Sequence, residues 1–225
     1  MSPRTTRAAA VCAALVLVGA LSATPALADG PDLTSKTLET QDEVCTVIAQ
    51  PTPPGQDIAF TPEPTTECFS SFGEALESVS GVPVTDPQVR AGEPAALRAY
   101  AEGQTARSQQ APGGPSATTA APGMTMMLGV AYKGANHTGG NKVFYSNGGN
   151  GCASGNTYGF PKLSTYLMNN NISAMSSYAR CWSTLYDLEN YVKGTSTNCV
   201  PSCATLGSMN DRASSIVFRP EGNID

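Results

Sequence analysis

The feature that most constrains the fold is an internal repeat in the C-terminal half of the chain. In each copy, an aromatic hairpin is followed by a serine pair that enters an apolar strand. The corresponding residues are Tyr132, His137, Ser176 and Ser177 in the first copy, and Tyr186, Tyr191, Ser214 and Ser215 in the second. Because one such unit cannot bury its apolar face alone, the repeat predicts two units that pack against each other.

Short apolar runs with Gly-rich and Asn-rich connections fill the same half of the chain. Strand-like runs cover residues 126–132, 142–145, 178–185 and 214–219, and one short helix is expected over residues 161–169. Strands of this length are typical of an antiparallel sandwich. We therefore predict an all-β domain over residues 124–225, which is long enough for one sheet-on-sheet core.

The first 28 residues have the layout of a Sec-type signal peptide. Arg4 and Arg7 precede an apolar run, and Ala26-Leu27-Ala28 matches an A-x-A cleavage site. The run is too short for a membrane-spanning helix, and no later stretch reaches the roughly 18 apolar residues that such a helix needs. We expect a secreted protein without a membrane association once residues 1–28 are removed.

An oxidising destination makes disulfides the expected state of the six cysteines that follow residue 28. Many pairings are open on sequence grounds. Proximity and the division of the chain favour three pairs: Cys45 with Cys68, Cys152 with Cys181, and Cys199 with Cys203. A zinc site is the alternative for the last pair, but the chain has one histidine and no second close cysteine pair to complete it.

Charge divides the mature chain into an acidic and a mildly basic half. Residues 29–123 carry 13 acidic and 4 basic side chains, whereas residues 124–225 carry 5 acidic and 7 basic ones. The basic excess is too small for a nucleic-acid partner. The asymmetry indicates an acidic leader attached to a mildly basic domain, and contact between the two is one of the arrangements left open.

The acidic half has few structural signals, and we expect a small, partly disordered segment of helix and coil over residues 29–102. The pattern favours a strand at 45–49, a helix at 67–80 and a weak helix at 93–102. These elements bury little surface, so the segment is not expected to fold alone. Residues 103–123 are rich in Pro, Gly and Ala, which predicts a flexible linker. The segment is then either a prodomain or a spacer.

The repeat and the sequence Asn210-Asp211-Arg212-Ala213-Ser214-Ser215 together resemble the βγ-crystallin Greek key motif. In that family, a hairpin with two aromatic residues is followed by an N/D-N/D-x-x-S/T-S loop, and two motifs make one domain. The resemblance covers roughly residues 126–220 and implies a two-Greek-key, βγ-crystallin-like sandwich. With the signal peptide and the disulfides, the chain is similar to small secreted bacterial members of the superfamily, which include metalloprotease inhibitors.

The resemblance also implies where Ca²⁺ would bind, because βγ-crystallin sites are shared between the motifs. One motif supplies a carbonyl and a hydroxyl oxygen, and the other supplies its leading Asn or Asp side chain. We align the first motif with residues 172–177, which leaves Asn169-Asn170-Asn171 out of register. One site then remains, formed by the Ala174 carbonyl, the Ser176 hydroxyl and the Asn210 side chain. Neutral ligands predict weak binding, since ligand charge raises Ca²⁺ affinity.

The sequence offers little for catalysis, and we expect a monomeric binding protein rather than an enzyme. His137 is the single histidine, so any Ser–His or Cys–His mechanism would depend on it. Asp187 and Glu189 share a predicted hairpin, but nothing indicates that they face each other across a cleft as a glycosidase pair must. No zinc-protease, nucleophile-elbow or phosphate-loop motif is present.

Inhibition of an extracellular protease is the most concrete binding role. The sequence Cys199-Val200-Pro201-Ser202-Cys203 would form a very short disulfide-closed loop. A rigid loop loses little entropy when it enters a protease cleft. The metalloprotease inhibitors that the chain resembles present a Cys-Val bond in a similar loop, which implies the Cys199-Val200 bond here. The alternative is a disulfide that only staples a hairpin.

Two further roles stay open on sequence grounds. One is a calcium-binding or purely structural βγ-crystallin module, and the other is a cell-wall-binding or antimicrobial module. The latter needs exposed aromatic side chains, for which Tyr145, Tyr158, Tyr166 and Trp182 are the candidates. Trp182 follows a predicted disulfide cysteine, so packing in the core is the competing role for it.

Overall fold

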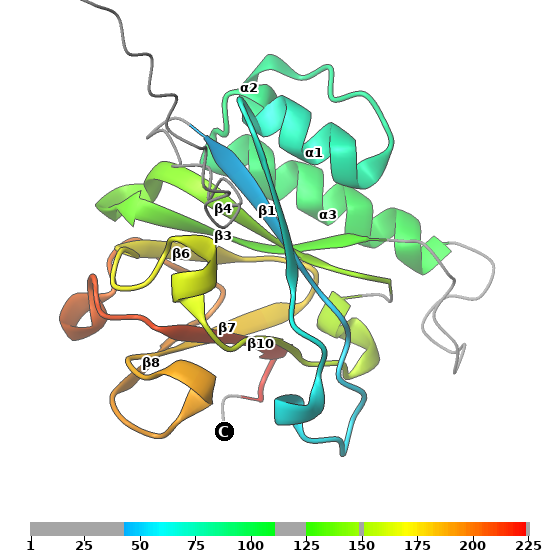
Figure 1. The fold of residues 1–225 in the computed structure, drawn as a ribbon. Helices are drawn as coiled ribbons and strands as arrows, with labels where there is room; N and C mark the ends of the chain where they lie inside the picture. Colours follow the sequence, from blue (N-terminus) through cyan, green and yellow to red (C-terminus); the bar gives the residue numbers. More distant parts are fainter. Residues whose placement is uncertain (1–42, 111–124, 149–150, 224–225) are drawn as a thin grey trace, which may run out of the picture. The chain divides into compact units, whose positions relative to one another are not determined.

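The computed structural model describes residues 43–110, 125–148 and 151–223, which form two β-sheets and the helices that pack on them (Figure 1). The predicted signal peptide and most of the predicted linker lie outside the described residues. The strands are β1 Val44–Ala49, β2 Thr65–Phe69, β3 Met126–Gly134, β4 Thr138–Ser146, β5 Tyr158–Phe160, β6 Ala174–Ser177, β7 Cys181–Tyr186, β8 Ser196–Cys199, β9 Ser202–Cys203 and β10 Ser215–Pro220. The helices are α1 Phe72–Ser80, α2 Pro87–Arg90 and α3 Pro94–Gln110.

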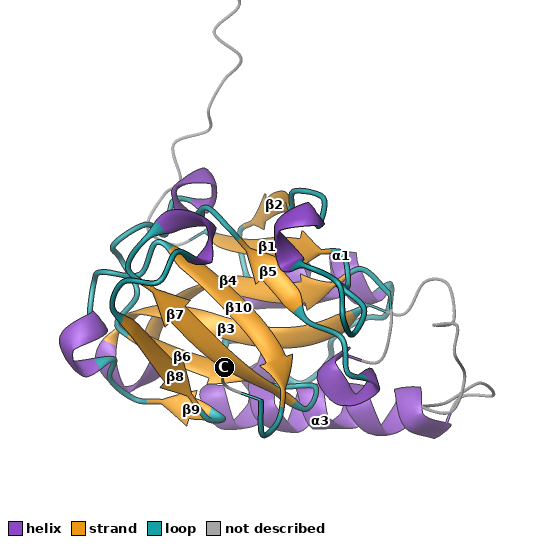
Figure 2. Ribbon diagram, turned by 90° about the horizontal axis from the view of Figure 1, so that it is seen from below, coloured by secondary structure: helices purple, strands orange, loops and turns teal. Residues whose placement is uncertain are grey.

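Each copy of the repeat forms a Greek key that places one of its four strands in the other sheet. The first motif puts β6, β3 and β4 side by side in a six-stranded sheet of order β2-β1-β4-β3-β6-β9, and its strand β5 lies at the edge of the second sheet. The second motif puts β10, β7 and β8 side by side in a second sheet of order β5-β10-β7-β8. Its strand β9 lies at the edge of the six-stranded sheet. Figure 2 shows the two layers that result. The predicted two-Greek-key sandwich is confirmed.

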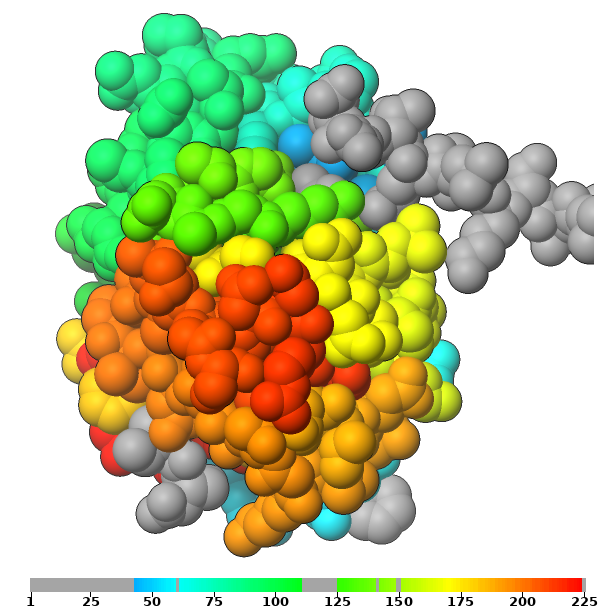
Figure 3. Space-filling model, turned by 90° about the vertical axis from the view of Figure 1, so that its left-hand side faces the viewer, coloured from blue at the N-terminus to red at the C-terminus, as the bar shows by residue number. Residues whose placement is uncertain are grey.

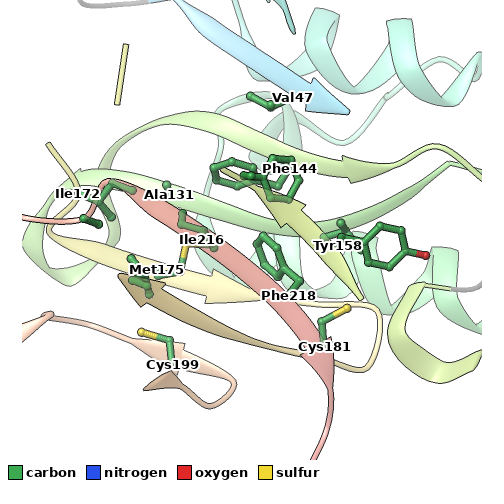
Figure 4. Close-up of a cluster of buried hydrophobic side chains, with 14 of the residues drawn as sticks. Val47, Ala131, Phe144, Tyr158, Ile172, Met175, Cys181, Cys199, Ile216 and Phe218 are labelled. Carbon is green, nitrogen blue, oxygen red and sulfur yellow. The ribbon is translucent and has the colours of Figure 1, made fainter. Parts of the chain in front are cut away.

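The core between the sheets is built from aromatic side chains of both motifs. The fully buried rings of Phe144, Phe160 and Phe218 lie 4.6, 5.6 and 5.7 Å apart in pairs, measured between centroids. Ile216 and Phe218 point into this core from the same face of β10, because alternate residues of a strand share a face (Figure 4). Full burial of one such side chain stabilises the fold by roughly 1.5–3 kcal/mol.

The outer face of the first sheet is also apolar, and the described part of the acidic segment covers it. β1 pairs in parallel with β4, so the segment contributes a strand to the sheet itself. Leu76 of α1 and Leu97 of α3 are fully buried against the sheet residues Val130 and Tyr145. Residues 43–110 are therefore more extensively structured than the sequence predicted, and they form one unit with the sandwich.

The helices of the acidic segment differ from the predicted ones at their ends. α1 begins at Phe72, after β2 and the N-cap residue Ser71, and it ends at Ser80, followed by Gly81 in the left-handed conformation of a helix C-cap. α3 continues to Gln110, so the predicted start of the linker at residue 103 lies inside a helix. Within the described residues, no helix has the length and apolar character that crossing a membrane requires.

The three predicted disulfides are confirmed. Cys45–Cys68 joins β1 to β2, and Cys152–Cys181 joins the first motif to the start of β7. Cys199–Cys203 closes the loop between β8 and β9. The last bond excludes the zinc alternative for these two cysteines, because a disulfide sulfur is no longer a thiolate ligand.

The substitution Leu97→Ala tests whether the outer-face core holds the helices to the sheet. We expect it to lower the free energy of unfolding by roughly 2–5 kcal/mol, because it leaves a cavity in a fully buried cluster. Urea denaturation of the full chain measures the loss. Val82→Ala is the control, since Val82 is 55% exposed. A loss no larger than that of the control would contradict the arrangement.

Candidate functional site

The two hairpin corners of the repeat have the same backbone and aromatic geometry. His137 and Tyr191 adopt positive φ angles of 61° and 59°. Tyr132 meets His137 edge-on with a centroid distance of 5.0 Å, and Tyr186 meets Tyr191 at 6.3 Å. The predicted pairing of the hairpin residues is confirmed, with His137 in the position of the second aromatic ring.

The strand registers show which residues of the two motifs correspond. Tyr132 lies opposite Ala174 in the β3–β6 ladder, and Tyr186 lies opposite Ser215 in the β7–β10 ladder. Ala174 is therefore the counterpart of Ser215. The alignment predicted from the sequence gave this place to Ser177, so it was wrong by three residues.

Hydrogen bonds between the motifs repeat the corrected correspondence. The Asn170 N–H donates to the Ala213 carbonyl at 2.9 Å, and the Asp211 N–H donates to the Ile172 carbonyl at 3.0 Å. Asn170 and Asp211 also share a positive φ, 54° and 52°. The first motif is thus Asn169-Asn170-Asn171-Ile172-Ser173-Ala174, which restores the two leading amides that the predicted alignment had lost.

This register changes the set of oxygen atoms that could hold a cation. Ser176 lies beyond the motif, and its hydroxyl is 3.2 Å from that of Ser202. Ser173 takes its place, and its hydroxyl reaches the second motif by donating to Asp211 Oδ1 at 3.0 Å. The same carboxylate accepts from Asn210 Nδ2 at 2.7 Å. Of the predicted ligands Ala174, Ser176 and Asn210, only Asn210 belongs to this cluster.

The cluster has the donor chemistry that Ca²⁺ prefers. Asn210, Asp211 and Ser173 supply amide, carboxylate and hydroxyl oxygens, which are hard ligands. On one face of the molecule, the segments around residues 170 and 210 lie side by side (Figure 3). Within the described ranges, no three His, Cys, Asp or Glu side chains are arranged to hold a metal ion. A cation here would therefore depend on neutral oxygens and one carboxylate.

The loop from Cys199 to Cys203 is fixed at its base and exposed at its tip. Cys199 is fully buried, whereas Val200 is 45% exposed and Pro201 is also exposed. The Pro201 carbonyl accepts the Ser177 N–H at 2.7 Å, and β9 pairs with β6. The Val200–Pro201 peptide bond is cis. The two side chains at the tip thus stand on a base held by the first Greek key.

His137 contacts this loop, which the sequence gave no means of predicting. Its Nε2 lies 2.8 Å from the Ser202 hydroxyl, and that hydroxyl donates to the Met175 carbonyl at 3.2 Å. In the described part of the chain, no carboxylate is hydrogen-bonded to His137. The contact therefore fixes the loop and lacks the orienting partner of a catalytic triad.

The carboxylates considered for glycoside hydrolysis have separate partners. Asp187 Oδ2 forms an ion pair with Arg212 at 3.1 Å, and Glu189 Oε1 accepts from the Ser164 hydroxyl at 2.9 Å. Each side chain is thereby engaged in holding its own loop. This arrangement does not present two carboxyl groups to one substrate.

Most of the aromatic residues considered for wall binding lie in the interior. Tyr145 and Tyr158 are fully buried and Tyr166 is 3% exposed, while Trp182 is half-buried. Burial raises the pKa of Tyr158 to about 12. These four residues therefore do not form an exposed aromatic patch, and the wall-binding prediction loses its basis.

Comparisons with known proteins found similar chains among solved structures alone. No protein-family model matches the sequence, and a search of curated proteins gave no match. Among solved structures, a βγ-crystallin domain from Flavobacterium johnsoniae is 28% identical, with an alignment covering 43% of this chain and 98% of that chain at a TM-score of 0.31. The N-terminal domain of protein S is 20% identical, and the alignment covers 41% of this chain and 96% of that chain at a TM-score of 0.31. A mutant βγ-crystallin domain from Clostridium beijerinckii is 16% identical, and the alignment covers 41% of this chain and 97% of that chain at a TM-score of 0.32. The fold assignment rests on the observed strand exchange and register.

The contact between His137 and the loop predicts a pH-dependent stability. Burial lowers the pKa of His137 below its usual value of about 6.5, so the unfolded chain binds a proton more readily than the folded one. The free energy of unfolding should therefore fall as the pH is lowered through about 6.5 and level off below the folded pKa.

Urea denaturation of the wild type and of His137→Gln between neutral and mildly acidic pH isolates this contribution. The variant keeps a hydrogen-bonding side chain but does not titrate. We expect the wild type to lose more stability than the variant on acidification. Parallel pH profiles would show that His137 does not contribute.

Proposed function

We propose that this chain is a secreted, non-enzymatic binding protein that inhibits an extracellular peptidase through the Cys199–Cys203 loop. The observation that carries the proposal is the contrast within the loop between a buried Cys199 and an exposed Val200. An apolar side chain on a fixed base suits insertion into an apolar subsite. The Cys199–Val200 bond is then the one offered to the peptidase.

The supports at the base of the loop favour inhibition over a simple staple. The disulfide closes the loop over a Cα–Cα distance of 5.2 Å, and the backbone hydrogen bond from Ser177 to Pro201 ties the tip to β6. The contact of Ser202 with His137 fixes the opposite side. A loop restrained in this way loses little conformational entropy on binding, which is the cost that weakens a flexible peptide.

The partner that fits this loop is a peptidase with an apolar subsite next to its catalytic centre. Neither Val200 nor Pro201 carries a charge, so affinity would come from apolar burial. Thermolysin-like metalloproteases and subtilisin-like serine proteases are suitable probes, because both cleave next to apolar residues. Inhibition of one class and not the other would identify the class of protease that the loop binds.

The substitution Val200→Asp in the full chain tests the proposed loop. Placing a carboxylate in an apolar subsite forfeits roughly 1.5–3 kcal/mol of apolar burial, which is about a tenfold or larger loss of inhibition. Val192→Asp is a matched control, because Val192 is 51% exposed in a different loop. Inhibition constants for the wild type and both variants are measured against each protease.

The same measurements can contradict the proposal in two ways. One is failure of the wild type to slow any of the proteases, and the other is equal inhibition by the two variants. Thermal unfolding of all three proteins checks that they are folded, and we expect equal midpoints because both valines are exposed.

A second candidate function, binding of Ca²⁺, is favoured by the corrected register of the motifs. The βγ-crystallin pattern, applied to that register, assigns one site to the Asn171 carbonyl, the Ser173 hydroxyl and the Asn210 side chain. The hydrogen bond from Ser173 to Asp211 supports this set, because it brings the two motifs together. Asp211 adds a negative charge that the earlier prediction lacked, which favours tighter binding.

The related site would use the Arg212 carbonyl, the Ser214 hydroxyl and the Asn169 side chain. Its backbone matches that of the first site, since Asn170 and Asp211 have nearly equal φ angles and each donates its N–H to a backbone carbonyl at the fourth position of the other motif. A titration of Ca²⁺ into the full chain should then report two sites of unequal affinity, with the weaker one lacking the Asp211 carboxylate.

Substitutions at Asp211 and at Ser176 decide between the registers. Millimolar Ca²⁺ is expected to raise the thermal midpoint of the wild type, because a ligand that binds only the folded state stabilises it. Asn210→Ala and Asp211→Asn should reduce this rise, and Asp211→Asn tolerates the positive φ of that position. Ser176→Ala should leave the rise unchanged. Loss of the rise in Ser176→Ala but not in Asp211→Asn would restore the original alignment.

A further inference from the structure

A cavity of about 390 Å³ lies between α3 and the segment that joins α1 to α2, on the face of the first sheet that the helices cover (Figure 1). One wall is the face of α3 that carries Tyr100, Gln104 and Arg107, which are spaced to lie on one side of a helix. Residues 82–86 form another wall, and Met126 at the start of β3 completes part of the lining. The cavity is separate from the disulfide loop and from the oxygen cluster of the two motifs.

Gln104 brings a hydrogen-bond donor to this cavity. The residue is only 8% exposed, and its Oε1 accepts the Met127 N–H at 3.3 Å. Because a backbone N–H can only donate, this bond fixes the orientation of the amide and leaves Nε2 with two N–H groups that have no partner among the described residues. Nε2 keeps accessible surface, unlike the sealed hydroxyl of Tyr145. Since Gln104 lines the cavity, a ligand there can reach this donor.

Arg107 places a cation about one helical turn from Gln104 on the same wall. Its Nε donates to the Gly103 carbonyl at 3.2 Å, and no carboxylate of the described residues forms an ion pair with it. Arg90, by contrast, is paired with Glu77 at 2.6 Å. The two terminal nitrogens of Arg107 are therefore available to an anion.

We propose that this cavity binds a small monocarboxylate that has an apolar body. The carboxylate accepts from the Gln104 amide and from the Arg107 guanidinium, which together supply donors for its two oxygens. Hydrogen bonds to an ionised group are stronger than those between neutral groups, so these two contacts would fix the head of the ligand. The proposal does not depend on peptidase inhibition or on Ca²⁺.

The rest of the lining suits an apolar body. Val82, Val84, Val89 and Met126 contribute aliphatic surface, and Tyr100 contributes a ring. Val82 is 55% exposed, so a ligand that covers it removes apolar surface from water. The volume of about 390 Å³ lies within the range of roughly 300–1,000 Å³ that is usual for small-molecule sites.

Asp86 limits the charge of the ligand. Its carboxylate caps α2 by accepting from the N–H groups of Gln88 and Val89, and the residue also lines the cavity. A second anionic group on the ligand would meet repulsion from this carboxylate. A monocarboxylate therefore fits better than a dicarboxylate or a phosphate.

Titration of small probes into the full chain tests the ligand class. Hexanoate has an aliphatic body and phenylacetate has an aromatic one. For each acid, the corresponding alcohol and amine are the uncharged and cationic controls, and acetate is the control without a body. Calorimetry should show saturable binding of at least one of the two acids, and binding at least tenfold weaker for its controls.

Two variants locate the binding. Arg107→Gln removes the cation and keeps a polar side chain, and Gln104→Met removes the amide and keeps a side chain of similar length. Each should weaken carboxylate binding at least tenfold, while Arg98→Gln, on the same helix and outside this cavity, should not. Gln104→Met also leaves the Met127 N–H unpaired, which lowers stability. Arg107 is exposed, so Arg107→Gln remains informative if Gln104→Met fails to fold.

The outcomes either support the proposal or overturn it. Binding of hexanoate alone or of phenylacetate alone supports it and identifies the body that the cavity accepts. Absence of saturable binding by both acids overturns it. Equal affinity for an acid and its alcohol also overturns it, because the head group would then not be recognised. Equal binding by the wild type and Arg107→Gln overturns it as well.

Discussion

The first sheet buries apolar side chains on both of its faces, and the arrangement of the other elements follows from that constraint. On β3, Leu128 and Ala131 belong to the core between the sheets, while Met127, Val130 and Tyr132 belong to the cluster under the helices. Exposing an apolar face of this kind to water would be unfavourable, since apolar burial is the main favourable term in folding. A two-Greek-key sandwich alone would expose it, so the chain needs residues 43–110 to cover it.

This covering layer also explains why residues 43–110 form one unit with the sandwich. β1 extends the first sheet along β4, with Val47 opposite Phe144, so removing the segment would expose both an edge and a face of the sheet. No disulfide joins the described part of the segment to the sandwich, because Cys45 pairs with Cys68 inside it. The two parts are held together by strand pairing and apolar contact. The same contact creates the cavity at Gln104 and Arg107.

Much of the fold could be predicted because duplication and local chemistry carry strong signals. The hairpin aromatics and the cysteine pairs lie close together in the sequence, and each follows from its own short pattern. The length of α3 could not be predicted, since its buried stripe contains polar and small residues, Ala101, Gln104 and Ser108 beside Leu97. That stripe fits against an apolar sheet without being strongly apolar itself, so its pattern resembles a linker.

The candidate site was predicted less well than the fold, because its geometry depends on pairing between distant strands. The serine pair at residues 176–177 mimics the motif that ends at Ser215, and only the ladder between β3 and β6 shows that Ala174 holds that place. The contact between His137 and Ser202 is likewise invisible in the sequence. It arises because β9 belongs to the second motif but pairs with a strand of the first.

One line of contacts links the two candidate functions. The Ser173 N–H donates to the Tyr132 carbonyl at 2.8 Å, the Tyr132 ring packs on His137, and His137 bonds Ser202 in the loop. A substitution at Tyr132 or His137 would thus disturb both the oxygen cluster and the loop, and its effect could not be assigned to either. Val200 and Asp211 lie at the two ends of this line. Substitutions at Val200 and Asp211 separate inhibition from Ca²⁺ binding, because neither side chain takes part in the contact between Tyr132 and His137.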